Sequence, residues 1–346
     1  MKIVIALVVF SIIILFHELG HFLLAKKNGI KVNEFCLGLG PTLVGFHKGE
    51  TFYSIKLLPF GGACMMEGED TESSDSRAFN SKSVWARISV VAAGPLFNFL
   101  MAFIFSFIIV CCTGYDLPVL SGVSEGYAAE EAGMMEGDVI VKMNGKRIHF
   151  YRDISAYGLY HAGETVEVTY ERDGERYTTT LVPRLDEESG RYLYGFIGAP
   201  YRQKTTNNVF TLAKYSIYEV GYWIDSTLES IRMLVSGGVS VNDLSGPVGI
   251  VSMVGDSYEE TVSYGAFYVF LQMLYTCVFL SANLGVMNLL PIPALDGGRL
   301  VFLIIEAIRG KRVDPDKEGF VHFIGLMLLL ALMVFVMFND IRKIFI

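Results

Sequence analysis

The sequence has little charge and no excess of basic residues. Of its 346 residues 18% are charged and 52% are hydrophobic, and the formal net charge is −8. So apolar a composition is not that of an ordinary soluble enzyme. The net negative charge gives no support for nucleic-acid binding, which needs a basic face. We therefore expect an α-helical polytopic membrane protein that carries some water-exposed mass, with the lipid bilayer as its surroundings and no nucleic acid partner.

Paired cysteine motifs are also lacking. The five cysteines form no C-x-x-C pair and no regular spacing, which excludes a disulfide framework and a cysteine-based zinc module. They lie in or near apolar segments, where cysteine usually acts as a small packing residue. Their positions are Cys36, Cys64, Cys111, Cys112 and Cys277.

Long hydrophobic runs, by contrast, are present. Four stretches reach the length of about 20 residues that the hydrocarbon core requires: residues 3–25, 88–112, 266–290 and 320–338. The first begins like a signal peptide, with Lys2 before the apolar run. Because that run continues through two histidines and holds no A-x-A cleavage site, we expect it to be retained as a span.

The remaining segments suggest a domain inserted between two membrane parts. We place the membrane parts at 1–112 and 249–346, the inserted domain at 115–200 and a connector at 207–248. Residues 209–235 of the connector have apolar side chains at helical spacing interrupted by charges. This pattern predicts an amphipathic helix that lies on the outer surface of the cell membrane.

Residues 31–66 differ from the helical spans around them. VNEFCLGLG and TFYSIKLLPFGGACMM are typical of short strands broken by glycine turns. Because open sheet edges are not tolerated in lipid unless they line a cavity, we expect a β-hairpin that re-enters the membrane beside the first span.

Lysines and arginines concentrate in the connections 26–86 and 309–317. The positive-inside rule places both connections in the cytoplasm. An even number of spans then puts both termini and the segment 113–265 outside the cell.

The first span contains HELGH, which places His17 and His21 one helical turn apart with Glu18 beside them. Ionisable groups inside a membrane span are costly and are functional by default. Two imidazoles can bind a zinc ion that lowers the pKa of a bound water to about 7, and a carboxylate can accept the proton. The motif therefore predicts a hydrolytic zinc site, with a helix-packing pair as the alternative.

A catalytic zinc site usually has a third protein ligand. The next acid after the motif is Glu34, in a non-helical stretch. The better candidate is Asp296 in MNLLPIPALDGGRL, where Pro291 and Pro293 break the helix and two glycines allow close approach of the backbone. The alternative role of Asp296 is the N-cap of a helix over 297–309, and the two roles can coexist.

Other ionisable groups lack metal-ligand spacing. We expect His322 to lie near the membrane interface, with a ligand or supporting role as the alternative. The acidic run is expected to be a solvated loop, with a gating role as the alternative. Its members are Glu67, Glu69, Asp70 and Glu72.

These motifs resemble those of the site-2 protease family of intramembrane zinc metalloproteases, peptidase family M50, and within it the bacterial RseP/RasP type with a single PDZ domain. HELGH is similar to the family's first-span motif, and N-x-x-P-x-P-x-L-D-G runs from Asn288 to Gly297. AAGPLFN at 92–98 and LSGPVGI at 244–250 resemble the second span and the segment before the third. The likeness covers nearly the whole chain.

By position, the resemblance implies that His17, His21 and Asp296 bind one zinc ion per chain and that Glu18 activates water. Asn288 would lie near the substrate backbone or the developing oxyanion. The substrate-binding set implied in this way is Asn288, Pro291, Pro293, Gly38, Leu39 and Gly40, the last three in a re-entrant hairpin that offers an edge strand.

The 115–200 segment resembles a PDZ domain, with GDVIVKMNGK containing an Asn-Gly hairpin turn. Such a domain either captures a peptide C-terminus or excludes bulky ectodomains, and both alternatives stay open here.

The function implied is regulated intramembrane proteolysis of single-span membrane proteins, of the anti-sigma factor or remnant signal peptide type, in a bacterial cell membrane. His17 would lie about 20 Å along the helix from Ile3, so cleavage is expected toward the cytoplasmic side. The rival hypotheses are a catalytically silent PDZ scaffold and, less favoured, a zinc or proton transporter.

Overall fold

The computed structural model describes residues 1–69, 73–198, 205–240 and 244–345, and the chain divides into two compact units. One unit comprises Met1–Ser106 together with Val239–Ile346, and the other is Phe107–Gly238. We describe each unit by itself.

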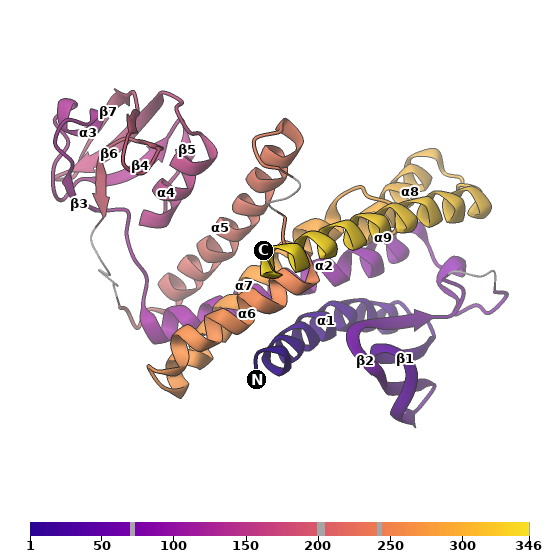
Figure 1. The fold of residues 1–346 in the computed structure, drawn as a ribbon. Helices are drawn as coiled ribbons and strands as arrows, with labels where there is room; N and C mark the ends of the chain where they lie inside the picture. The colour runs from indigo at the N-terminus through magenta and orange to yellow at the C-terminus, as the bar shows by residue number, and fades with distance from the viewer. Residues whose placement is uncertain (70–72, 199–204, 241–243, 346) are drawn as a thin grey trace. The chain divides into compact units, whose positions relative to one another are not determined.

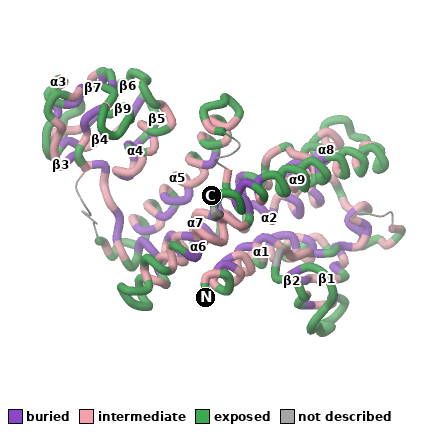
Figure 2. The backbone as a smooth tube through the Cα atoms, in the orientation of Figure 1, coloured by how far each residue is buried: buried purple, intermediate pink, exposed green. Residues whose placement is uncertain are grey.

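Within the described ranges, four helices are long and apolar enough to cross a membrane: α1 (Lys2–Lys27), α2 (Val84–Thr113), α7 (Ala266–Leu289) and α9 (Pro315–Phe345) (Figure 1). The four predicted spans are confirmed as helices, and α9 extends beyond the expected bounds at both ends. Half of the apolar window of α7 is buried, whereas only 11% of that of α9 is (Figure 2). Most of α9 is therefore left to face lipid.

A further helix, α6 (Pro247–Val262), precedes α7 and was not expected from the sequence. Its N-cap is Gly246, which has no side chain to bond the first free N–H groups. Asp340 of α9 accepts them instead, from the Gly246 nitrogen at 3.2 Å and the Gly249 nitrogen at 2.8 Å. The LSGPVGI segment is thus a helix start that is capped by a distant side chain.

The predicted strands form β1 (Val32–Lys48) and β2 (Thr51–Met66), which lie against α1 (Figure 1). The first part of β1, residues 32–37, pairs with 62–66 and also with 52–55 of β2. Residues 44–48 pair with the other side of 51–55. Glycines at positive φ, Gly38, Gly40 and Gly61, allow the strands to bend into this arrangement.

The second unit contains the expected α+β domain. Its two helices, α3 (Ala128–Glu131) and α4 (Tyr151–Tyr160), lie between short strands in the sequence. A four-stranded sheet has the order β5 (Lys146–Arg147), β4 (Val139–Met143), β6 (Val166–Arg172), β7 (Glu175–Leu181). Two further pairs are β3 (Leu120–Val123) with β10 (Phe196–Gly198), and β8 (Arg184–Asp186) with β9 (Arg191–Leu193). The predicted Asn-Gly turn joins β4 to β5, with both residues at positive φ.

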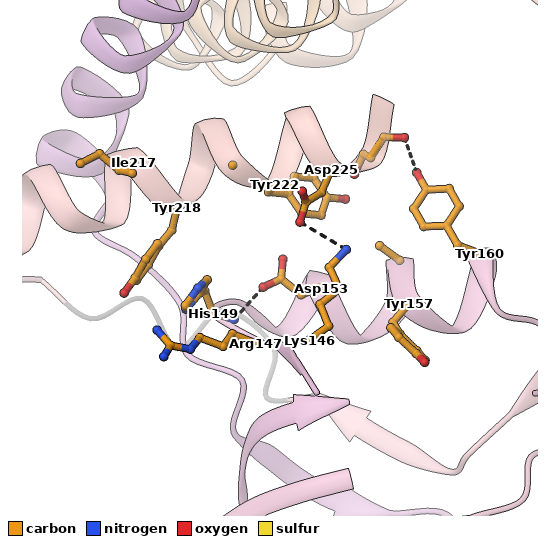
Figure 3. Close-up of a pocket in the computed structure, with 13 residues that line it drawn as sticks. Lys146, Arg147, His149, Asp153, Tyr157, Tyr160, Ile217, Tyr218, Tyr222 and Asp225 are labelled. Atoms are coloured by element: carbon orange, nitrogen blue, oxygen red, sulfur yellow. Dashed lines mark hydrogen bonds and ion pairs between the residues drawn. The ribbon is translucent and has the colours of Figure 1, made fainter. Parts of the chain in front are cut away.

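The connector forms α5 (Val209–Ser236), which packs against α4 within this unit. Arg152 of α4 forms an ion pair with the buried Glu219 and stacks on the Tyr222 ring. His149 stacks on Tyr218 with 3.6 Å between ring centroids, and the two elements enclose a cavity of about 300 Å³ (Figure 3). Aromatic and charged contacts therefore hold α5 to the domain.

Candidate metal centre

The two histidines of HELGH lie four residues apart on α1, and both rings are buried against α2. The carbonyl of Val90 lies 2.9 Å from His21 Nδ1, and the Asn98 side chain lies 3.1 Å from His17 Nδ1. These contacts orient both Nε2 atoms toward the same point.

Gly94 of α2 explains why the two rings can approach that helix. A Cβ at Gly94 would lie 2.3 Å from His21 Nε2 and 2.8 Å from His17 Cε1. Pro95 follows inside the helix, where it removes one backbone hydrogen bond and bends the chain. Val90, whose carbonyl is the acceptor for His21, lies one turn before Gly94 on the same helix.

Asp296 comes from the opposite end of the sequence, as the first residue of α8 (Asp296–Arg309). Leu295 holds the N-cap position, so the alternative in which Asp296 is the N-cap is wrong. Asp296 is positioned by a tight turn between α7 and α8. In this turn a Cβ at Gly297 would lie 2.1 Å from the Leu290 carbonyl oxygen. Only glycine permits that approach.

The three predicted ligand atoms converge. His17 Nε2 and His21 Nε2 are 3.2 Å apart, and Asp296 Oδ2 lies 3.2 Å from the first and 3.5 Å from the second. Ligands about 2.0–2.1 Å from a tetrahedral zinc ion are separated by roughly 3.3–3.4 Å, so the donor set fits this metal. Asp296 Oδ2 is buried and accepts no hydrogen bond from the described residues, as suits an oxygen that faces a cation.

Asn98 is a functional candidate that the sequence analysis missed, although it is a polar residue in the second span. If His17 Nε2 binds a metal, His17 Nδ1 carries the proton and needs an acceptor. The Asn98 amide presents its nitrogen to that atom, while its Oδ1 is buried without a partner among the described residues. With the amide turned by 180°, its oxygen faces His17 Nδ1 and gives the histidine its acceptor.

Glu18 and the three candidate ligands line one cavity of about 480 Å³. One wall is the β2 segment 62–66, which pairs with β1 on one side only within the described residues. Gly62 brings this segment close to the catalytic candidate, since a Cβ there would lie 3.2 Å from Glu18 Cγ. The edge strand beside the cluster is therefore 62–66.

The predicted substrate-binding residues do not line this cavity. Gly38, Leu39 and Gly40 lie at the bend of β1, and Asn288 is near the end of α7. Pro291 and Pro293 lie in the turn before α8. Their substrate contacts stay predictions.

Glu34, the less favoured candidate for the third ligand, accepts hydrogen bonds from Ser54 and Lys56.

Asp296 also lines a second cavity of about 1050 Å³, together with His322 and three arginines, Arg87, Arg299 and Arg312. Arg299 pairs with Glu69, and both residues line this cavity and the first one. Glu69, which we expected in a solvated loop, lies in a loop and is partly buried by its pairing with Arg299. Asp70 and Glu72 of the same run lie outside the described residues.

Comparison with known proteins agrees with this chemistry. The model of peptidase family M50 matches residues 5–332. The zinc metalloprotease RasP of Geobacillus kaustophilus is 33% identical over 420 residues, covering 98% of this chain and 97% of that protein. The regulator of sigma-W protease RasP of Bacillus subtilis is 30% identical over 422 residues, covering 98% of each chain.

Two further matches complete the comparison. A Clostridium acetobutylicum protein that carries a zinc metalloprotease name is 41% identical over 340 residues, covering 98% of this chain and 97% of that one. Among solved structures, the PDZ domain of an SdrC-like protein from Listeria monocytogenes matches 24% of this chain and 85% of its own, with 17% identity and a TM-score of 0.21. From the family model and the near full-length relatives we conclude that the chain belongs to peptidase family M50, the site-2 protease family, as a membrane zinc metalloprotease of the RasP type.

Proposed function

We propose that the chain is an intramembrane endopeptidase in which His17, His21 and Asp296 hold the zinc ion and Glu18 is the general base. The observation that carries this proposal is the convergence of three buried ligand atoms from α1 and α8 at mutual distances of 3.2–3.5 Å. When bound, zinc polarises the scissile carbonyl and lowers the pKa of a coordinated water.

The protein groups around the metal have separate tasks. Glu18 shares the cavity with the ligands and follows His17 directly on α1, so its carboxylate can take the proton of the attacking water and return it to the leaving amine. The Val90 carbonyl holds His21 with its Nε2 free for the metal. Asn288 is proposed to contact the substrate backbone near the oxyanion.

We further propose that the substrate is a single-span membrane protein, cut in an extended segment. The peptide groups of a transmembrane helix are hydrogen-bonded to one another, so the helix must unwind locally before one of its peptide bonds is hydrolysed. The free edge of β2 at 62–66 borders the metal cavity and can pair with the unwound segment by strand addition. Gly38, Leu39 and Gly40 would contribute by bending β1, whose pairing places this edge.

For the domain at 115–200 we propose a PDZ domain that excludes bulky ectodomains. Tyr151 of α4 donates a hydrogen bond to the Phe196 carbonyl of β10 at 3.2 Å, and a Cβ at Gly198 would lie 2.4 Å from the Tyr151 ring. The ring occupies the space beside β10, where a peptide would add as a strand. This occupancy favours the filter over C-terminal capture.

The proposal is tested with purified full-length protein and a labelled single-span substrate. We expect Glu18→Gln to retain zinc and to lower the cleavage rate by about 100- to 10,000-fold, the usual contribution of general base catalysis. Asp296→Asn should lower the bound zinc, whereas Glu34→Gln, the matched control, should not. Cleavage by Glu18→Gln at the native rate would remove Glu18 from the mechanism.

A further inference from the structure

The turn that delivers Asp296 contains a strained residue. Ala294 has φ +75°, a left-handed conformation that residues with a Cβ rarely adopt and that persists only when its surroundings impose it. Ala294 is two residues before Asp296, so a change of its backbone angles would redirect the start of α8.

The conformation belongs to a turn over residues 292–295, which the Leu295 N–H closes by donating to the Ile292 carbonyl at 3.2 Å. Helix α9 contacts this turn from outside. His322 Nδ1 accepts a hydrogen bond from the Ala294 N–H at 2.9 Å. For Nδ1 to accept, the ring must be neutral with its proton on Nε2. The centroid of the His322 ring also lies 5.6 Å from that of the Phe302 ring of α8, so this α9 side chain contacts both α8 and the turn before it.

One turn further along α9, Gly325 contacts the same segment. A Cβ at Gly325 would lie 2.4 Å from Pro293 Cβ and 2.7 Å from the Pro293 carbonyl oxygen. Residues three apart share a helix face, so His322 and Gly325 act on neighbouring residues of one turn. Gly319, two turns before Gly325, has no atom within 4 Å of such a Cβ.

We propose that His322 and Gly325 are positioning residues that hold the Pro293–Ala294 turn and thereby set Asp296 for metal binding. The inference rests on the proposed function, in which Asp296 is a zinc ligand. It gives α9, the least buried of the four long helices, a defined part in the metal site.

The test is zinc affinity, measured on the purified full-length protein by competition with a chromogenic chelator, with zinc alone as the probe. Supporting residues of a metal ligand typically contribute about 10- to 100-fold in affinity, and we expect His322→Leu to weaken zinc binding by about 10-fold. Phe320→Leu, an exposed position on the same helix, should leave the affinity unchanged.

Ala294→Gly separates the positioning role from general damage to the fold. Glycine adopts the left-handed conformation without strain, so His322→Leu combined with Ala294→Gly should regain most of the lost affinity. Gly325→Ala should weaken zinc binding, and Gly319→Ala should not. These pairs remain informative if one variant folds poorly, since each has its own control on α9.

Two results would overturn the inference. One is native zinc affinity in both His322→Leu and Gly325→Ala while Asp296→Asn binds weakly. The other is a double variant that stays as weak as His322→Leu, because the loss would then not pass through the Ala294 conformation. Native affinity in Asp296→Asn would instead overturn the proposed ligand set, and this inference with it.

Discussion

At the scale of single residues, the proposed metal centre depends on small contacts that admit few replacements. His17 and His21 differ in their supports, one held by a side-chain amide and the other by a backbone carbonyl. The absence of a side chain at Gly94 is equally important, since an added methyl group would occupy the space next to His21 Nε2.

The contact between Asn98 and His17 yields a prediction. We expect Asn98→Ala to weaken zinc binding by about 10- to 100-fold, because His17 loses the acceptor that fixes its orientation and tautomer. Chelator competition on the purified protein measures this. Asn98→Asp, which keeps an acceptor oxygen, should retain more affinity than Asn98→Ala. Equal affinity in the native and alanine proteins would mean that Asn98 does not support His17.

At the scale of elements, two contacts are important: the pairing of β1 with the β2 segment 62–66, and the packing of α5 on its domain. The β2 segment 62–66 forms an edge beside the metal cavity because the bent β1 pairs it on the other side. In the second unit, α5 is held by stacking and ion pairs that involve His149, Arg152 and Lys146. The contact of α5 with its domain contains the titratable imidazole ring of His149.

Acid should loosen α5 from its domain. Burial lowers the pKa of His149 below its usual 6.5, and the positive charges of Lys214 and Arg147 lower it further. A depressed pKa stabilises the folded contact above about pH 6.5 and loses that stabilisation as the pH falls through the folded-state value. Fluorescence of Trp223 on α5 should therefore change below pH 6.5 in the native protein. His149→Gln should flatten this response, and an unchanged response would exclude His149 as its source.

At the scale of the whole molecule, the proposed zinc site joins the two ends of the sequence. His17 lies in the first long helix and Asp296 follows the third, so neither membrane part can form the centre alone. The membrane orientation proposed from the basic loops determines where this centre meets water. That orientation places the segment 309–317 in the cytoplasm and the inserted domain outside.

Cysteine labelling tests this orientation. In a protein with Cys111 and Cys112 replaced by alanine, a membrane-impermeant maleimide should label Glu188→Cys in intact cells. Lys311→Cys should react only after the cells are permeabilised. Both native side chains are exposed, so access to the reagent depends on the side of the membrane. Labelling of Lys311→Cys in intact cells would reverse the proposed topology.

The sequence by itself determined the four long helices, the glycine-bent strands, the Asn-Gly turn and the pairing of HELGH with Asp296. Helical spacing, apolar length and turn residues are local properties, and the two motifs carried the family resemblance. Only the tertiary structure decided that Asn98 contacts His17, that 62–66 is the edge beside the candidate ligands, and that His322 and Gly325 contact the turn before Asp296. These contacts join residues far apart in the chain, so they depend on how helices and strands pack and leave no periodic signal in any one segment.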